Sequence, residues 1–225
     1  MPHGTTRPAN SPAKVAIVDD HPMVREGLTA RISRYADLEI CGEAADVAEA
    51  IDLVQRTDPD LVIVDISLKS GNGIDLIKQI KSRNERVKML VSSMHDESLY
   101  AERALRAGAM GYINKQEMPE KLIEAIRHVL AGKVYLSPQM AERMLNRSLG
   151  RGGPAESSPL QKLSDRELEV FELIGQGLST RAIANQLSRS VHTIETHREK
   201  IKVKLNLASG VELQQRAVQW MLERK

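Results

Sequence analysis

Residues 61–68 read LVIVDISL, and this short stretch decides the fold of the first half of the chain. Four apolar residues follow one another without a break and are ended by Asp65. A strand with one wet face alternates apolar and polar residues, so an unbroken run predicts a strand that is buried on both faces. Strands of this kind belong to parallel sheets that helices cover on both sides.

Strand and helix patterns alternate outward from this stretch, between residues 14 and 131. The expected strands are residues 14–18, 38–43, 61–64, 87–91 and 111–113. The expected helices are residues 23–33, 47–56, 73–82, 98–107 and 119–131. Five strand–helix units in about 120 residues predict an α/β fold, a five-stranded parallel (βα)5 sheet of the flavodoxin-like kind.

The C-terminal part of the chain has helical patterns and no strand signal. The expected helices are residues 165–175, 180–186, 191–205 and 210–222. Ser164 followed by Glu167 is a capping box that opens the first helix, and Ser179 and Ser190 are expected to cap the next two. A tight turn at residues 187–190 predicts a helix-turn-helix in a second, smaller, all-α domain.

A linker separates the two patterns. Residues 146–161, NRSLGRGGPAESSPLQ, are rich in Gly, Ser and Pro, which predicts a flexible segment. The predicted organisation is a disordered tail at 1–13, an α/β domain at 14–135, a helix and flexible linker at 136–161, and an all-α domain at 162–225. The α/β domain carries 17 basic and 20 acidic residues, and the all-α domain carries 11 and 8. This basic excess is weak evidence for nucleic acid by itself.

The composition excludes several classes of protein. With 41% hydrophobic and 28% charged residues and a net charge of +2, the chain fits a folded protein. Only 6 residues are aromatic, which argues against an aromatic base-stacking surface. No apolar run approaches the roughly 20 residues that span a bilayer, and the N-terminus lacks the pattern of a secretory signal. One cysteine, Cys41, excludes an internal disulfide framework, so we expect a cytoplasmic protein without a membrane partner.

Chemically useful side chains stand at the carboxyl ends of the predicted strands. They are Asp19 and Asp20 after the first strand, Asp65 after the third, Ser92 and Ser93 at the end of the fourth, and Lys115 after the fifth. Parallel strands place these ends at one edge of the sheet, where ligands bind. Three carboxylates there would repel one another without a cation, and oxygen ligands at an open site favour Mg²⁺. A carboxylate in such a site can attack a phosphoryl group, while the metal and an ammonium group neutralise the transferred oxygens.

Each of these residues also has a simpler explanation. An aspartate or serine after a strand is usually a turn former or a helix cap, and a single lysine is usually a surface residue. Four different strands nevertheless place the right group at the same edge, which favours a site.

The strand ends resemble the receiver domain of response regulators. The matching pieces are VDDH at 18–21, VDISL at 64–68, SSMHDE at 92–97 and AGAMGYINK at 107–115. The resemblance implies that Asp65 accepts a phosphoryl group. It also implies a Mg²⁺ site formed by Asp19, Asp20, Asp65 and the backbone carbonyl of Ser67.

The same resemblance assigns the residues that respond to phosphorylation. Ser93 matches the switch hydroxyl, Tyr112 the switch aromatic and Lys115 the site lysine. Lys69 and Gln116 depart from the family, which often has proline at both positions. Neither departure removes a reacting group, although Lys69 adds a flexible cation near the site.

Residues 191–205 have the pattern of a recognition helix. Ile194, Ile201 and Leu205 share one face, and polar residues fill the other. A solvated helix of a small bundle would show the same pattern. The flanking sequence LSDRELEVFELIGQGLSTRAIANQLSRSVHTIETHREKIKVKL, at 163–205, resembles the LuxR-type helix-turn-helix.

This second resemblance implies that residues 191–205 enter the major groove of double-stranded DNA. The implied DNA contacts are Glu195, Thr196 and Glu199 toward base edges, and Thr193, Arg198, Lys200, Lys202 and Lys204 as further candidates, the basic ones toward phosphates. Several relatives carry lysine where this chain has Glu195 and Glu199; a glutamate can accept from cytosine N4 but repels phosphates. His197 and Trp220 are expected to have packing roles.

A receiver followed by this module is the arrangement of the NarL/FixJ subfamily. It implies a two-component transcription regulator, not an enzyme, with a sensor histidine kinase as partner and a homodimer formed on phosphorylation. A haloacid-dehalogenase-like phosphotransferase is the enzyme alternative, but it needs an aspartate two residues after the nucleophile, where this chain has Ser67. A ligand-sensing LuxR regulator would have a different N-terminal domain with more aromatic residues. A degenerate receiver would lack part of the set Asp65, Ser93 and Lys115.

Overall fold

The computed structural model describes residues 11–68, 71–117, 119–150 and 158–223. They form two compact units, each described by itself: the first ends at Ser137, and the second begins at Pro138 and also takes in the short segment that ends at Asn72. Residues 1–10 of the expected tail, and residues 151–157 of the expected linker, lie outside the described residues, as does Lys69. Within the described residues, no helix has both the length and the apolar character needed to cross a membrane.

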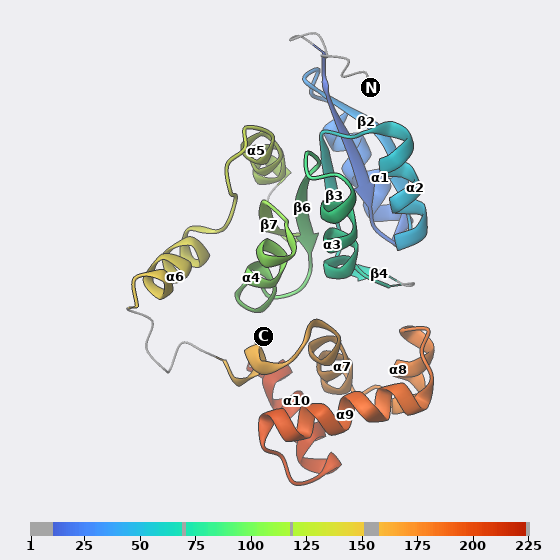
Figure 1. The fold of residues 1–225 in the computed structure, drawn as a ribbon, viewed down its shortest axis with the longest axis vertical. Coiled ribbons are helices and arrows are strands. Elements are labelled where there is room, and N and C mark those ends of the chain that lie inside the picture. The colour runs from blue at the N-terminus through green and yellow to red at the C-terminus, as the bar shows by residue number, and fades with distance from the viewer. Residues whose placement is uncertain (1–10, 69–70, 118, 151–157, 224–225) are drawn as a thin grey trace. The chain divides into compact units, whose positions relative to one another are not determined.

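The N-terminal unit is a five-stranded parallel sheet with the strand order β2-β1-β3-β6-β7 (Figure 1). Its strands are β1 Ala13–Val18, β2 Leu38–Ala44, β3 Leu61–Val64, β6 Lys88–Ser93 and β7 Gly111–Asn114. Its helices are α1 Pro22–Ile32, α2 Val47–Thr57, α3 Gly73–Arg83, α4 Glu97–Ala107 and α5 Pro119–Leu130. The predicted fold is therefore confirmed. The two-residue strands β4 (Ser67–Leu68) and β5 (Gly71–Asn72) were not expected, because elements this short have no periodic signal.

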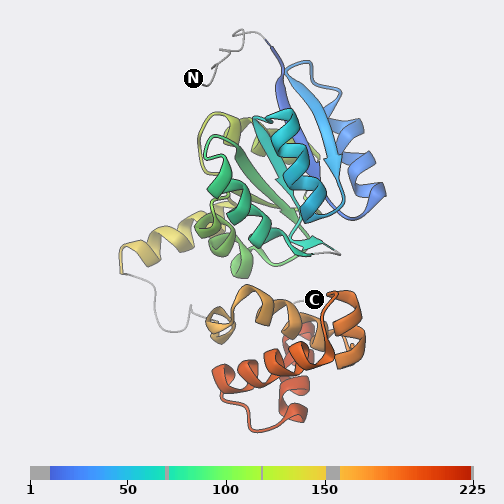
Figure 2. The ribbon, with the colours of Figure 1, turned by 45° about the vertical axis from the view of Figure 1, so that its right-hand side comes forward.

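Helices cover both faces of this sheet, as Figures 1 and 2 show. Under α1 and α5, one core joins Ile32 and Ile126 to alternate strand residues such as Val15 and Ile63. The neighbouring strand residues are equally buried and face the helices on the other side, among them Val62. Burial on both faces explains why the central strands are apolar at nearly every position.

The strand register brings the carboxyl ends level with one another. Val18 pairs with Val64, and Val64 pairs with Val91. One strand further, Ser93 pairs with Asn114. The residues that follow β1, β3 and β7 therefore lie next to one another at a single edge.

The C-terminal unit is helical, as predicted. It contains α6 Pro138–Ser148, the 3-10 helix η2 Pro159–Lys162, α7 Asp165–Gly175, α8 Thr180–Gln186, α9 Val191–Leu205 and α10 Gly210–Leu222. The capping box of Ser164 and Glu167 is present, and Ser179 and Ser190 cap α8 and α9. Helix α6 extends to Ser148, into the segment that we expected to be linker, because the glycines and the proline of that segment begin only at Gly150.

Candidate functional site

One ammonium group bridges two carboxylates at the carboxyl edge of the sheet. Nζ of Lys115 donates hydrogen bonds to Oδ2 of Asp19 at 2.6 Å and to Oδ2 of Asp65 at 2.7 Å. Backbone hydrogen bonds between neighbouring strands hold Asp65 and Lys115 in place. The N–H of Asp65 donates to the carbonyl of Val18, and the N–H of Lys115 donates to the carbonyl of Ser93. Three of the predicted site residues are thus brought together from three strands.

Burial sets the electrostatics of this bridge. The side chains of Asp19, Asp65 and Lys115 are 2%, 4% and 13% exposed. Burial raises the pKa of Asp65, and the neighbouring Lys115 offsets part of that rise. Burial alone would lower the pKa of Lys115, but the carboxylates of Asp65 and Asp19 raise it above its ordinary value. Lys115 therefore remains a cation at neutral pH.

Asp20 completes an acidic cluster beside this bridge. Asp19, Asp20, His21 and Asp65 each place one potential metal-binding atom within 4.8 Å of the others. Among the described residues, Oδ1 of Asp20 is buried without a well-aligned hydrogen-bond donor, although Nδ1 of His21 lies 2.7 Å away. A buried carboxylate oxygen without a donor is costly, and a divalent cation with oxygen ligands would satisfy it. The residues present therefore fit Mg²⁺, and His21 is a neighbour that we did not predict.

Gly73 is a second site residue that the sequence pattern did not single out. A Cβ at this position would lie 2.1 Å from the carbonyl oxygen of Asp65 and 2.7 Å from Cα of Ile66. The N–H of Gly73 also donates to the carbonyl of Ile66 at 2.8 Å. Only a glycine lets the start of α3 pack this closely on the segment that carries Asp65.

The chain with Gly73→Ala is expected to lose about 1–3 kcal/mol of stability, because the new methyl group overpacks against backbone atoms that cannot rotate away. Gly27→Ala is the matched control, since a Cβ at Gly27 in α1 meets nothing within 4 Å. It should add up to about 1 kcal/mol through helix propensity. Urea denaturation followed by circular dichroism measures both; equal stabilities would contradict the close packing at Gly73.

Ser93 and Tyr112 lie on the neighbouring strands β6 and β7, and both are buried. The hydroxyl of Tyr112 donates to the backbone carbonyl of His95 at 2.8 Å. The backbone N–H of His95 points to Oγ of Ser93, with 3.3 Å between the two atoms. The two predicted switch residues are therefore linked through the loop that contains His95.

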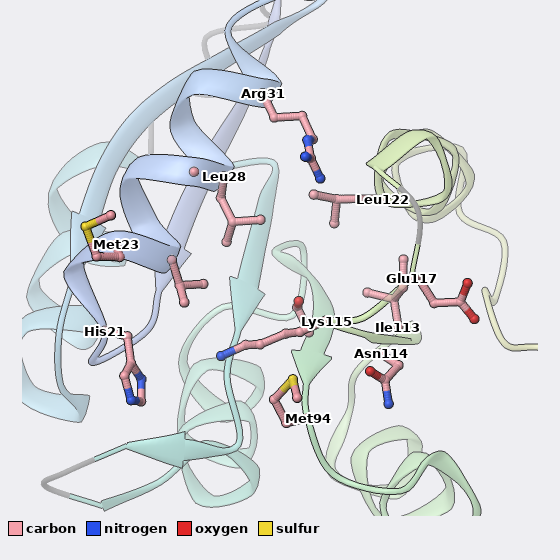
Figure 3. Close-up of a pocket in the computed structure, with 13 residues that line it drawn as sticks. His21, Met23, Leu28, Arg31, Met94, Ile113, Asn114, Lys115, Glu117 and Leu122 are labelled. Carbon is pink, nitrogen blue, oxygen red and sulfur yellow. The ribbon is translucent and has the colours of Figure 1, made fainter.

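A cavity of about 490 Å³ lies between α1 and α5, next to the acidic cluster (Figure 3). Met23, Leu28 and Leu122 give it a largely apolar lining. Of the acidic cluster and its lysine, His21 and Lys115 line it, and the three aspartates do not. The polar chemistry of the site therefore lies beside this cavity and not within it.

The predicted DNA-contact residues lie on α9 and at its start. Ile194 and Ile201 are fully buried, which leaves the opposite face to solvent, as expected. The exposed residues of that face include Glu195, Thr196, Glu199 and Lys200. Thr193 is half-buried, and its Oγ1 lies 2.8 Å from Oγ of the cap residue Ser190.

Carboxylates lie next to two basic residues of this face and reduce its positive charge. Arg198 lies 3.6 Å from Glu195, and Lys202 lies 2.9 Å from Glu199. The partners in each pair are three residues apart on one helix, and the carboxylates are 50% and 66% exposed, so both ion pairs are weak. DNA phosphates can therefore compete for Arg198 and Lys202.

Lys204, one of the predicted DNA contacts, also pairs with a carboxylate inside its own domain. Its Nζ donates to Oε2 of the buried Glu167 at 2.6 Å, which joins α9 to the first turn of α7. Burial alone would raise the pKa of Glu167, but the bonds from Lys204 and Ser164 lower it. A lysine that neutralises a buried carboxylate helps to hold the domain together, and since its side chain is still 38% exposed, its contact with DNA stays a prediction. Trp220 packs on Phe171 with ring centres 5.7 Å apart, which agrees with its expected packing role.

Family models match both units of the chain. The model described as the response regulator receiver domain matches residues 15–127. The model described as bacterial regulatory proteins, luxR family, matches residues 161–217.

Curated relatives match over nearly the full chain. The oxygen regulatory protein NreC of Staphylococcus carnosus is 36% identical over 216 residues, which cover 94% of this chain and 98% of the relative. The nitrate/nitrite response regulator protein NarP of Escherichia coli is 34% identical over 217 residues, which cover 94% and 100%. The response regulator GacA of Pseudomonas aeruginosa is 31% identical over 200 residues, which cover 89% and 92%.

Solved structures agree with this pattern. A two-component response regulator of the LuxR family from Aurantimonas is 37% identical, with a TM-score of 0.58 over 62% of this chain and 99% of that one. RcsB from Salmonella enterica serovar Typhimurium, bound to promoter rprA with the phosphomimetic BeF3⁻, is 27% identical. Its TM-score is 0.63 over 91% of this chain and 97% of that one.

Proposed function

This chain belongs to the response regulators that join a receiver domain to a LuxR-type DNA-binding domain, and from that premise we propose that it controls transcription by accepting a phosphoryl group on Asp65. The observation that supports this most is the bridge from Lys115 to Asp19 and Asp65. We propose domain limits of 14–135 for the receiver and 162–225 for the DNA-binding domain. A cytoplasmic location and the absence of an enzymatic activity toward small molecules are part of the same proposal.

The proposed reaction transfers a phosphoryl group from a phosphohistidine of a sensor kinase. An oxygen of Asp65 forms a bond to phosphorus while the bond from phosphorus to the imidazole nitrogen breaks, and the electron pair stays on that nitrogen. The ammonium group of Lys115 can donate a hydrogen bond to a phosphoryl oxygen while it keeps its hydrogen bond to Asp19. The positive charge of Lys115 then stays beside the transferred group. The hydroxyl of Ser93 is proposed to donate a hydrogen bond to a second phosphoryl oxygen. Tyr112 is proposed to move toward the phosphoryl group together with Ser93.

Asp19, Asp20, Asp65 and the backbone carbonyl of Ser67 are proposed to hold Mg²⁺. Bound there, the ion would reduce the negative charge that opposes attack by a carboxylate on a phosphoryl group. The buried Oδ1 of Asp20 supports this assignment, because among the described residues no well-aligned donor bonds it and its one close neighbour is Nδ1 of His21 at 2.7 Å.

Asp20→Ala is expected to weaken Mg²⁺ binding at least about tenfold, because a site that takes few protein carboxylates loses one of them. Calorimetric titration of the full chain with Mg²⁺ measures this directly. Asp52→Ala is the control, since Asp52 is 72% exposed on α2 and remote from the cluster. Equal affinities in the wild type and the Asp20 variant would remove Asp20 from the metal site.

Helix α9 is proposed to read the major groove with Glu195, Thr196 and Glu199, while Thr193, Arg198, Lys200, Lys202 and Lys204 position it on the DNA backbone. Phosphorylation is proposed to form a homodimer, which engages two half-sites and gains affinity through effective concentration. The promoter-bound RcsB structures support the DNA partner, and the structure of two RcsB dimers on two parallel DNAs supports the dimer.

Selection of genomic DNA fragments by the full chain tests this function. With Mg²⁺ and acetyl phosphate, the wild type should enrich a limited set of fragments, and the enrichment should fall steeply with salt as counterions are released. The Asp65→Asn chain under the same conditions is the control and should enrich them far less. Equal enrichment by the two chains, with and without the donor, would contradict control by Asp65.

A further inference from the structure

The ring of His95 is held between the segment after Asp65 and helix α4. Its Nε2 and Oγ of Ser67 share a hydrogen bond of 2.6 Å. One face of the ring packs on the buried Tyr100 of α4, with ring centres 4.5 Å apart. The ring therefore has a fixed orientation, set by Tyr100 on one side and by Ser67 on the other.

Ser67 stands two residues after Asp65 and touches the site through its backbone. Burial raises the pKa of Asp65, and the backbone N–H of Ser67 is one of the groups that offset part of that rise. The carbonyl of Ser67 is the backbone ligand that we assign to the metal. A shift of Ser67 would move these backbone groups, so the contact of its side chain with His95 bears on the geometry of the site.

The backbone around His95 is also held in place. The carbonyl of His95 accepts from Tyr112, and Asp96 caps α4 by accepting from the N–H of Ser98 at 2.7 Å. These contacts involve backbone atoms of residue 95 or other residues, so a substitution at His95 leaves them available. The ring can therefore be tested separately from the loop.

We propose that His95 is a positioning residue, which holds Ser67 through its ring and so keeps the backbone of Ser67 aligned for Asp65 and for the divalent cation. Groups that orient metal ligands without touching the metal typically affect affinity by about 10–100-fold. The proposal rests on the proposed function of the acidic cluster. It adds a residue to that site from a loop that carries no metal ligand.

Direct Mg²⁺ titration of the full chain by calorimetry, without a phosphoryl donor, tests the proposal. His95→Ala and Ser67→Ala should each weaken Mg²⁺ binding about tenfold, and the double variant should bind no worse than either single variant, because both remove one contact. His95→Gln, which keeps a hydrogen-bonding group near the position of Nε2, should recover part of the affinity. Met94→Ala is the control, since Met94 is the 58% exposed neighbour of His95.

The outcomes separate this proposal from the proposed function. If the wild type binds Mg²⁺ and the His95→Ala chain binds it equally well, the positioning role is overturned while the site stands. Additive losses in the double variant would overturn it as well, because the two side chains would then act separately. A wild type that neither binds Mg²⁺ nor accepts a phosphoryl group would instead overturn the proposed function. Ser67→Ala removes a single oxygen, so it keeps the test valid if His95→Ala fails to fold.

Discussion

The chain with Asp65→Asn is expected to gain no phosphoryl group from acetyl phosphate and Mg²⁺, while the wild type gains one. The amide has nearly the same shape as the carboxylate but lacks its charge and its nucleophilic oxygen. Lys115 keeps its bond to Asp19 in this variant, so the fold of the edge has a remaining ion pair. Intact-mass measurement over time gives the stoichiometry directly.

A matched carboxylate checks that the effect belongs to this position. Asp75→Asn changes an aspartate that is 56% exposed on α3, and that chain should be labelled like the wild type. Undiminished labelling of the Asp65→Asn chain would show that another residue accepts the group.

Lys115→Ala is expected to have the second largest effect, on both stability and phosphorylation. The substitution leaves Asp19 and Asp65 facing each other with no cation, and removal of one partner from a buried ion pair costs about 3–5 kcal/mol. Mg²⁺ should restore part of this loss, because it returns positive charge to the cluster. Phosphorylation should slow about 10²–10³-fold, as is typical when one group that stabilises transferred charge is removed.

Urea denaturation by circular dichroism, with EDTA and then with Mg²⁺, measures the stability effect. Trp220 belongs to the other unit, so its fluorescence is a poor reporter for the receiver. Lys121→Ala is the control, because Lys121 pairs with Glu117 on the surface, where both side chains are partly exposed. Exposed pairs contribute about 0–1 kcal/mol. Equal stability of the Lys115 and Lys121 variants would show that the bridge does not support the fold.

The sequence predicted the sheet and most of the acidic edge, because both depend on local patterns. Strands buried on both faces have continuous apolar runs, and the register of a parallel sheet brings their ends level. Asp19, Asp65 and Lys115 could therefore be placed together before any contact was known. The helix starts at Ser164, Ser179 and Ser190 were predictable for the same reason, since a cap acts within a few residues.

Other features depend on contacts between distant segments, which no local pattern reports. Ser67 and His95 are 28 residues apart, and Glu167 and Lys204 are 37 apart. Gly73 looked like an ordinary helix start, and its constraint appears only when the carbonyl of Asp65 lies beside it. These three cases explain why the contact of Ser67 with His95, the close packing at Gly73 and the pairing of Lys204 with Glu167 required the structure.

The central claim is that this receiver carries its phosphoryl group on Asp65, and borohydride trapping tests it most directly. Borohydride reduces an aspartyl phosphate to homoserine with release of phosphate, so the modified position can be read by peptide mass mapping. After treatment with acetyl phosphate and Mg²⁺, homoserine is expected at position 65 and at no other aspartate of the chain. Homoserine at Asp19, Asp20 or another position, with an unmodified Asp65, would contradict the account.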